Sequence, residues 1–128
     1  MRALSLPCSL GDAADRITIL TIKSERIGDA AKLRNVSREL GEISAVFFAA
    51  VSRTPEFDAL FDRLKAVNGR LWEIEDAIRL CEAKGDFGAE FIRLARSVYR
   101  TNDDRAAIKR EINTLLGSDL VEEKSYAG

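Results

Sequence analysis

Residues 57–81, FDALFDRLKAVNGRLWEIEDAIRLC, decide the fold of this chain. Apolar side chains recur in this stretch at alternating steps of three and four, a spacing that only a helix keeps on one face. Thr54 and Pro55 precede it as an N-cap and a first helical residue, and Gly85 follows it as a stop signal. The apolar positions are Phe57, Leu60, Leu64, Val67, Leu71, Ile74, Ile78 and Cys81. The stretch therefore predicts one long helix over about 55–83.

The same spacing continues on both sides of this stretch. Residues 33–50 carry it upstream, and residues 91–115 carry it downstream. Asp86 is placed to cap the downstream helix, which we expect to end at Gly117. A polar quartet at 101–104 could also cap a new helix, but the unbroken register across it favours one long helix.

The segment before these helices has a composition that conflicts with its spacing. Five of the six residues 17–22 are β-branched, which is typical of a strand. The three-and-four spacing of a helix nevertheless runs through Ala13, Ile17, Leu20, Ser24 and Ile27. A lone strand among three long helices would have no sheet to join, and packing overrides a weak propensity. We therefore predict a helix over 12–27.

The predicted fold is all-α, an antiparallel up-down-up-down four-helix bundle with a short N-terminal extension and a C-terminal tail. The connections near 28–29, 53–54 and 85–86 are short, so consecutive helices should be antiparallel neighbours. A chain of 128 residues is the size of one domain. We expect all of 1–128 to form this single helical domain, with its core at about 12–117 and the tail at 118–128.

Composition argues against several classes of protein. The net charge is -1 and residues of both signs are scattered along the chain, whereas a nucleic-acid-binding surface has an excess of Lys and Arg. No apolar run approaches the roughly 18 residues that a membrane span needs. The chain lacks histidine, and its two cysteines form no metal-binding pattern. We therefore expect no metal, no cofactor, no nucleic-acid partner and no membrane. Two cysteines far apart in sequence indicate free thiols and a cytoplasmic location.

Charged and polar side chains interrupt the apolar faces of the predicted helices. A buried charge needs a partner. These side chains therefore form either salt bridges that tie helices together or a charged pocket between helices. Trp72 lies beside them and could either belong to the hydrophobic core or form a wall of such a pocket. We expect Arg26 or Lys23 to reach a carboxylate on another helix, above all Glu75. The candidate ligand-binding residues are Asp15, Lys23, Arg26, Asn68, Trp72, Glu75, Arg105 and Lys109.

Several segments resemble an uncharacterised family of small bacterial proteins. They are residues 11–27, 67–76, 85–87 and 117–126, so the resemblance spans nearly the whole chain. It implies membership of a domain family of unknown function and no established activity.

A second likeness is to the all-helical chorismate mutases, in which Arg and Lys side chains line a pocket for a dianion. Those enzymes carry an acidic residue, an apolar ladder and a cationic residue about ten positions on. Here Asp15 and Arg26 are eleven positions apart with Lys23 between them, so the register departs from that pattern by one.

Two functions from different classes remain open. The first is a protein-interaction or adaptor module that binds a partner protein or a second copy of the chain as a homodimer. No nucleophile stands out beside a general base, and the tail 121–126 offers a conspicuous polar and aromatic segment. The alternative is an enzyme or sensor that binds a small anionic metabolite, a carboxylate or nucleotide sugar, in a Lys/Arg-lined pocket. Stabilising an anion needs neither a nucleophile nor a histidine.

Overall fold

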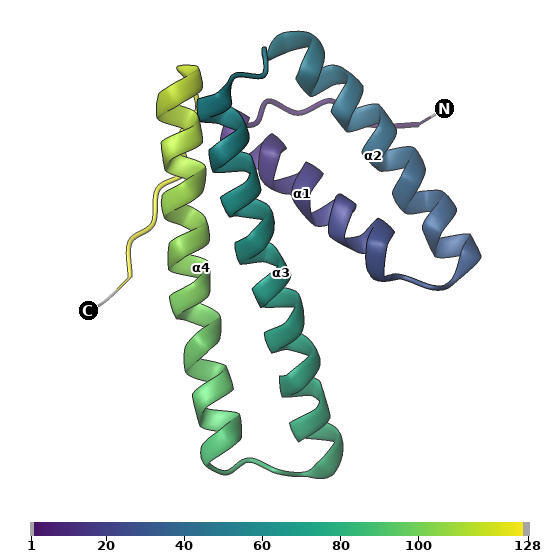
Figure 1. Ribbon diagram of the computed structural model, residues 1–128, viewed down its shortest axis with the longest axis vertical. Helices are drawn as coiled ribbons and strands as arrows, with labels where there is room; N and C mark the ends of the chain where they lie inside the picture. Colours follow the sequence, from purple (N-terminus) through teal and green to yellow (C-terminus); the bar gives the residue numbers. More distant parts are fainter. Residues whose placement is uncertain (1, 127–128) are drawn as a thin grey trace.

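The computed structural model describes residues 2–126, and within them the chain forms four α-helices and no strand (Figure 1). The all-α prediction is confirmed, and residues 17–22 are helical despite their strand-like composition. Residues 127 and 128 of the predicted tail lie outside the described part. The helices are α1 (Leu10–Arg26), α2 (Ala30–Ala50), α3 (Pro55–Lys84) and α4 (Ala89–Leu116).

The long helices begin and end at the expected signals. The Thr54 side chain accepts a hydrogen bond from the Phe57 amide, and Pro55 is the first residue of α3. Gly85 ends α3 with a φ of 65°, and Gly117 ends α4 with a φ of 66°. These are left-handed conformations that strain any residue with a Cβ, so glycine is the natural residue at both positions. Helix α4 is continuous through 101–104, as the unbroken register predicted.

Two helix starts differ from the expectation. Asp86 does not cap α4, because its amide completes the end of α3 by donating to the Cys81 carbonyl at 2.9 Å. Helix α4 begins after Gly88, whose amide donates to Asp86 Oδ1. Helix α1 starts before residue 12, because the Ser9 side chain accepts a hydrogen bond from the Asp12 amide and caps it.

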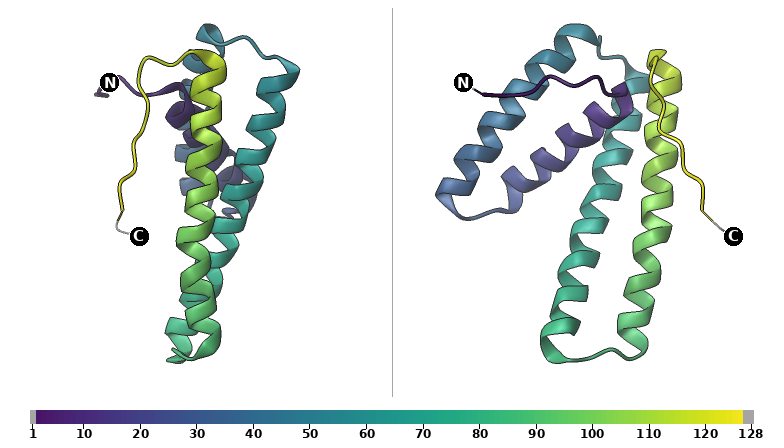
Figure 2. Two further views of the ribbon diagram at one scale, coloured as in Figure 1. Left: turned by 90° about the vertical axis from the view of Figure 1, so that its left-hand side faces the viewer. Right: turned by 180° about the vertical axis from the view of Figure 1, so that it is seen from behind.

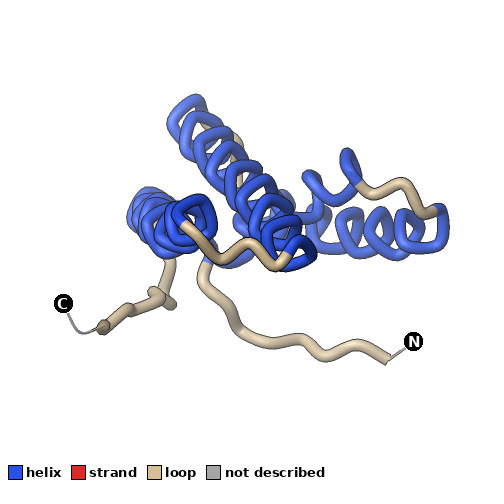
Figure 3. The backbone as a smooth tube through the Cα atoms, turned by 90° about the horizontal axis from the view of Figure 1, so that it is seen from below, coloured by secondary structure: helices blue, strands red, loops and turns tan. Residues whose placement is uncertain are grey.

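The four helices form two hairpins of unequal length. Helices α1 and α2 make the short hairpin, and α3 and α4 make the long one, with antiparallel neighbours in each (Figure 1). Helix α1 packs against α2, α3 and α4. The predicted four-helix bundle is confirmed, but its two hairpins diverge in an open V instead of running as parallel columns (Figures 2 and 3).

The hydrophobic core lies where the two hairpins meet. Phe57, Leu64 and Ile112 are fully buried there. At the other side of the core, α2 reaches α3 through aromatic rings, with the Phe47 and Phe57 centroids 5.8 Å apart. Burial of such side chains contributes roughly 1.5–3 kcal/mol each, so this junction holds the two hairpins together.

The long hairpin is well covered only in its inner half. We call residues 69–100, all of which the structure describes, the outer half; only Cys81 and Leu94 are buried in it. Helix α1 covers the inner half and diverges from the outer half (Figure 1). Nine residues are buried in the inner half, namely Phe57, Leu64, Val67, Asn68, Thr101, Ile108, Lys109, Ile112 and Asn113.

Candidate functional site

Asp15 lies at the centre of a polar layer between α1, α3 and α4. Its carboxylate is almost fully buried and accepts two hydrogen bonds from Arg105, one of them from Nε at 2.9 Å and the other from Nη2. The Asn68 amide nitrogen donates to Asp15 Oδ1 at 2.8 Å and to Thr18 Oγ1 at 2.9 Å. The structure thus brings three predicted site residues, Asp15, Asn68 and Arg105, into one network.

The Arg105 guanidinium is held by side chains of α1 and α4. Hydrogen bonding to Asp15 raises the pKa of its guanidinium, against the opposing effect of partial burial. Its Nη1 also donates to Asn102 Oδ1 at 3.4 Å. No buried side-chain nitrogen or oxygen within the described residues lacks a hydrogen-bond partner. The interpretation of internal salt bridges therefore holds for Asp15 and Arg105, since a buried pair is tolerated when it is fully hydrogen-bonded.

Lys109 lies one turn further along α4 and joins α1 to the tail. Its Nζ is 2.7 Å from Asp12 Oδ1 and 2.5 Å from Glu122 Oε2, and the residue is 8% exposed. Burial lowers the pKa of Lys109, but hydrogen bonds to Asp12 and Glu122 outweigh that effect and raise it overall. Two carboxylates from different segments therefore hold Lys109 as a cation.

A cleft of about 740 Å³ opens between α4 and the tail, next to these ion pairs. The tail runs back along α4 (Figure 2), with Lys124 Nζ 3.5 Å from the Asn102 carbonyl oxygen. Hydrogen bonds from Arg96 and Arg100 lower the pKa of the exposed Tyr99 hydroxyl at the cleft wall. The lining includes Val98, Tyr99, Asn102, Arg105, Lys109, Glu122, Lys124 and Tyr126.

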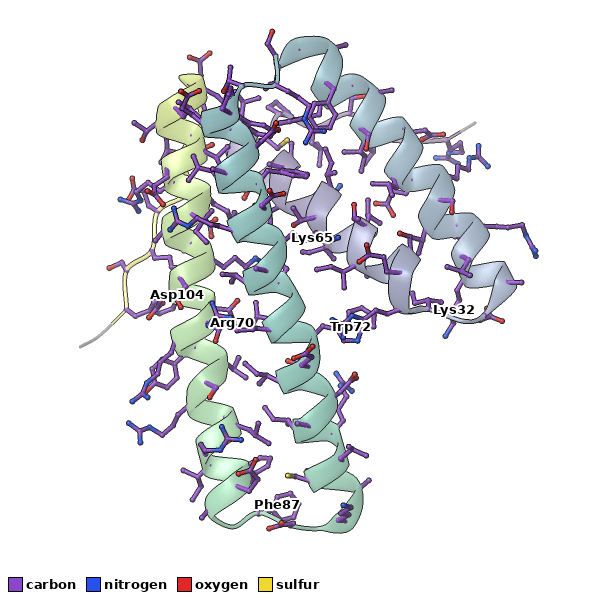
Figure 4. All side chains as sticks on the ribbon, in the orientation of Figure 1. Lys32, Lys65, Arg70, Trp72, Phe87 and Asp104 are labelled. Atoms are coloured by element: carbon purple, nitrogen blue, oxygen red, sulfur yellow. The ribbon has the colours of Figure 1, made fainter. Side chains whose placement is uncertain are left out.

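Four predicted site residues, Lys23, Arg26, Trp72 and Glu75, lie outside this network. The Glu75 carboxylate lies 3.5 Å from Arg79 of the same helix. The predicted pair of Arg26 with Glu75 is therefore wrong. Arg26 does reach a carboxylate on another helix, as predicted, but that carboxylate is Glu73, whose Oε1 lies 3.3 Å from Arg26 Nη2. Trp72 projects from α3 toward the last turn of α1 (Figure 4).

Replacing Arg26 by alanine is expected to lower the free energy of unfolding by only about 0–1 kcal/mol. The Arg26 and Glu73 side chains are 37% and 67% exposed, so water screens their attraction. Urea denaturation followed by circular dichroism measures the change. The Glu73→Ala variant should behave in the same way, and a loss above about 2 kcal/mol in either would indicate a buried pair.

Gly11 marks a close approach between α1 and α4. Its amide donates to Asn113 Oδ1 at 2.7 Å, and a Cβ placed on Gly11 would lie 2.5 Å from the Lys109 carbonyl oxygen. The preceding amide, of Leu10, donates to Ser118 Oγ at 3.1 Å. The start of α1 is thus fixed to both α4 and the beginning of the tail.

Several residues of the network were not predicted from the sequence. Asp12 could have been found, because it precedes Asp15 by three positions and shares its helix face. Thr18 likewise follows Asp15 by three positions, but threonine on a helix commonly bonds its own backbone, as Thr18 does with the Asp15 carbonyl. Glu122 lies in the conspicuous tail segment 121–126, but periodicity does not indicate that this segment folds back onto α4.

The charged side chains of this network lie in oppositely charged pairs. Within residues 2–126 no three His, Cys, Asp or Glu side chains are grouped so that they could hold a metal ion. Asp15 and Lys109 are both engaged by oppositely charged partners. The part of this site that lies open to solvent is the cleft beside Arg105 and Lys109.

Comparisons with known proteins identify a family and no activity. A family model described as "Family of unknown function (DUF6165)" matches residues 4–128. No curated protein and no solved structure matches the chain. The likeness to chorismate mutases gains no support from the geometry, because Asp15 pairs with Arg105 while Arg26 lies beside Glu73. None of the helices within residues 2–126 has the length and apolarity that crossing a bilayer requires.

Proposed function

The chain belongs to a family of unknown function, DUF6165, and we propose that it is a protein-interaction module that binds a partner helix along the outer half of α3 and α4. The observation that carries the proposal is the sparse burial of this outer half, where only Cys81 and Leu94 among residues 69–100 are buried. Two helices alone leave the flanks of their apolar seam in water, and a third element is what covers such a flank.

Helix α1 indicates which kind of element could cover the outer half of the long hairpin. It covers the inner half by burying Ile17 and Leu20 while packing against both α3 and α4. Trp72 lies four residues beyond Asn68 on α3, so helical periodicity places it on the same side that faces α1. Half-buried apolar residues continue along the outer half, namely Leu71, Trp72, Ile74, Ile78, Phe91 and Val98. An amphipathic partner helix would continue the surface that α1 covers.

A cytoplasmic location is part of this proposal. Cys8 is exposed and Cys81 is buried, and both are free thiols. Free thiols in these positions suit a reducing compartment, in which disulfides are rare.

Hydrogen exchange tests the premise that the outer half lacks cover. Amides of residues 74–98 are expected to exchange faster than those of 57–68 and 101–113, because fewer buried contacts oppose local opening. Mass spectrometry after timed deuterium labelling of the isolated protein gives the comparison. Equal protection of the inner and outer halves would show that the long hairpin needs no partner.

Site-specific cross-linking tests the partner itself. A photoreactive side chain at exposed Arg79, in the outer half, is expected to form an adduct with a partner helix in the host cell. The same side chain at exposed Arg34 on α2 serves as the control. The identified helix, made as a peptide, should then change the fluorescence of Trp72, the only tryptophan, when added to the purified protein. Equal adducts from both positions, or a peptide that does not bind, would contradict the proposal.

A second copy of this chain is the main competing occupant. In that case the adduct from position 79 would be with the chain itself, and sedimentation would show a dimer. Phe91→Glu places a charge on the half-buried surface and should dissociate that dimer. Such a result would mean that the surface binds a second copy of this chain and not a different partner protein.

A further inference from the structure

We propose that the cleft between α4 and the tail binds a small organic carboxylate, and that the Glu122 side chain occupies the position of the ligand carboxylate when no ligand is bound. This site borders the surface proposed for a partner helix at Val98, but it rests on a different observation. That observation is the surplus carboxylate at Lys109, which has two acidic partners within 2.7 Å.

The two partners of Lys109 differ in how firmly they are held. Asp12 belongs to the first turn of α1, which is fixed to α4 by the hydrogen bond from Gly11 to Asn113. Glu122 belongs to the tail, in which residues 118–126 form no helix, and its neighbours Val121 and Glu123 are exposed. Asp12 alone balances the charge of Lys109, so the loss of Glu122 leaves no uncompensated buried charge.

The other contacts of the tail are also easily broken. Glu123 lies 3.5 Å from Arg110, and both side chains are more than half exposed. Lys124 lies 3.7 Å from Asp103, and their side chains are 27% and 64% exposed, so water reaches the pair from the Asp103 side. Exposed ion pairs of this kind contribute little, because water screens them. The tail can therefore leave α4 at small cost and free the position beside Lys109.

The charges around the cleft select a carboxylate over a phosphate. Three acidic residues, Asp12, Asp15 and Glu122, accompany the two cations Arg105 and Lys109. Asp103 and Lys124 also line the cleft, but they pair with each other and leave this balance unchanged. A monoanionic carboxylate in place of Glu122 keeps this balance, whereas a phosphate dianion would add one more negative charge beside two fixed carboxylates.

The walls of the cleft favour a carboxylate that carries an apolar ring. Val98, Tyr99 and Tyr126 line the space beside Lys109 and Arg105. Tyrosine rings offer flat apolar surfaces for stacking, and the guanidinium of Arg105 adds N–H donors beyond those bound to Asp15 and Asn102. The ligand class is therefore an aromatic or similarly flat monocarboxylate.

A titration with benzoate tests the site on the full chain. Backbone amide signals in NMR spectra should shift for residues 98–109 and 120–126, which surround the cleft. Glu122→Gln removes the competing charge and should tighten benzoate binding about tenfold, as expected if the tail occupies the position about nine-tenths of the time. Glu123→Gln, the matched control in the next residue, should bind benzoate as the unmodified chain does.

The chemical controls separate the carboxylate from other causes. Benzamide, which has the same ring without the charge, should give no saturating shifts, and inorganic phosphate should bind more weakly than benzoate. Equal benzoate affinities in Glu122→Gln and Glu123→Gln would overturn the role of Glu122. Shifts confined to other parts of the chain, or tighter binding of phosphate, would overturn the carboxylate site.

Discussion

Replacing Asp15 by alanine is expected to lower the free energy of unfolding by about 3–5 kcal/mol, because the carboxylate belongs to a buried ion pair. Asp15 is 5% exposed and accepts hydrogen bonds from both Arg105 and Asn68. Its removal leaves the partly buried Arg105 guanidinium without its charged partner and takes away one of the two acceptors of the Asn68 amide. Chemical denaturation followed by circular dichroism gives the change, and loss of the network should also reduce contact between α1 and the long hairpin.

The matched control for Asp15 is an exposed ion pair that also joins two helices. Arg63 on α3 lies 3.3 Å from Glu111 on α4, and both side chains are more than half exposed. Glu111→Ala should therefore cost about 0–1 kcal/mol. If Asp15→Ala costs no more than Glu111→Ala, the polar layer is solvated and does not tie the helices together.

Replacing Gly11 by alanine is expected to lower the free energy of unfolding by about 2–4 kcal/mol. The new Cβ would lie 2.5 Å from the Lys109 carbonyl oxygen and 2.9 Å from Asn113 Oδ1. The first of these atoms belongs to the backbone of α4 and cannot rotate away, so α1 itself must shift. That shift weakens the hydrogen bond from the Gly11 amide to Asn113. Thermal and urea denaturation both report the loss.

Gly41 provides the matched control for this substitution. It lies within α2, and a Cβ on it would meet nothing within 4 Å. Gly41→Ala should therefore raise stability by about 0.5–1 kcal/mol, because alanine favours the helix and restricts the unfolded chain. A Gly11→Ala variant as stable as Gly41→Ala would show that the start of α1 is loosely packed.

The helices could be predicted because their signals are local. Thr54, Pro55 and Gly85 determine the bounds of α3 through hydrogen bonds and backbone angles that involve only near neighbours. The apolar spacing of residues 13–27 likewise outweighs their strand-like composition. The divergence of the hairpins was not predictable in this way, because it depends on which flank of α3 the core residues of α1 contact.

The candidate site was predictable in part for the same reason. Asp15, Asn68 and Arg105 each lie on a helix face that points inward, so periodicity predicts that they face the interior. Periodicity does not give the level at which residues of different helices meet, which is why Arg26 meets Glu73 and not Glu75. Glu122 was missed, because ion pairs, not apolar spacing, position the tail against α4.

The bond from Gly11 to Asn113 links residues that are 102 positions apart in sequence. Each hairpin has a short connection and can form from contacts between neighbours along the chain, which are made quickly. The buried polar layer joins α1 to both helices of the long hairpin, so it can form only when the two hairpins come together. A chain still being synthesised therefore cannot complete the docking of α1 until α4 has emerged.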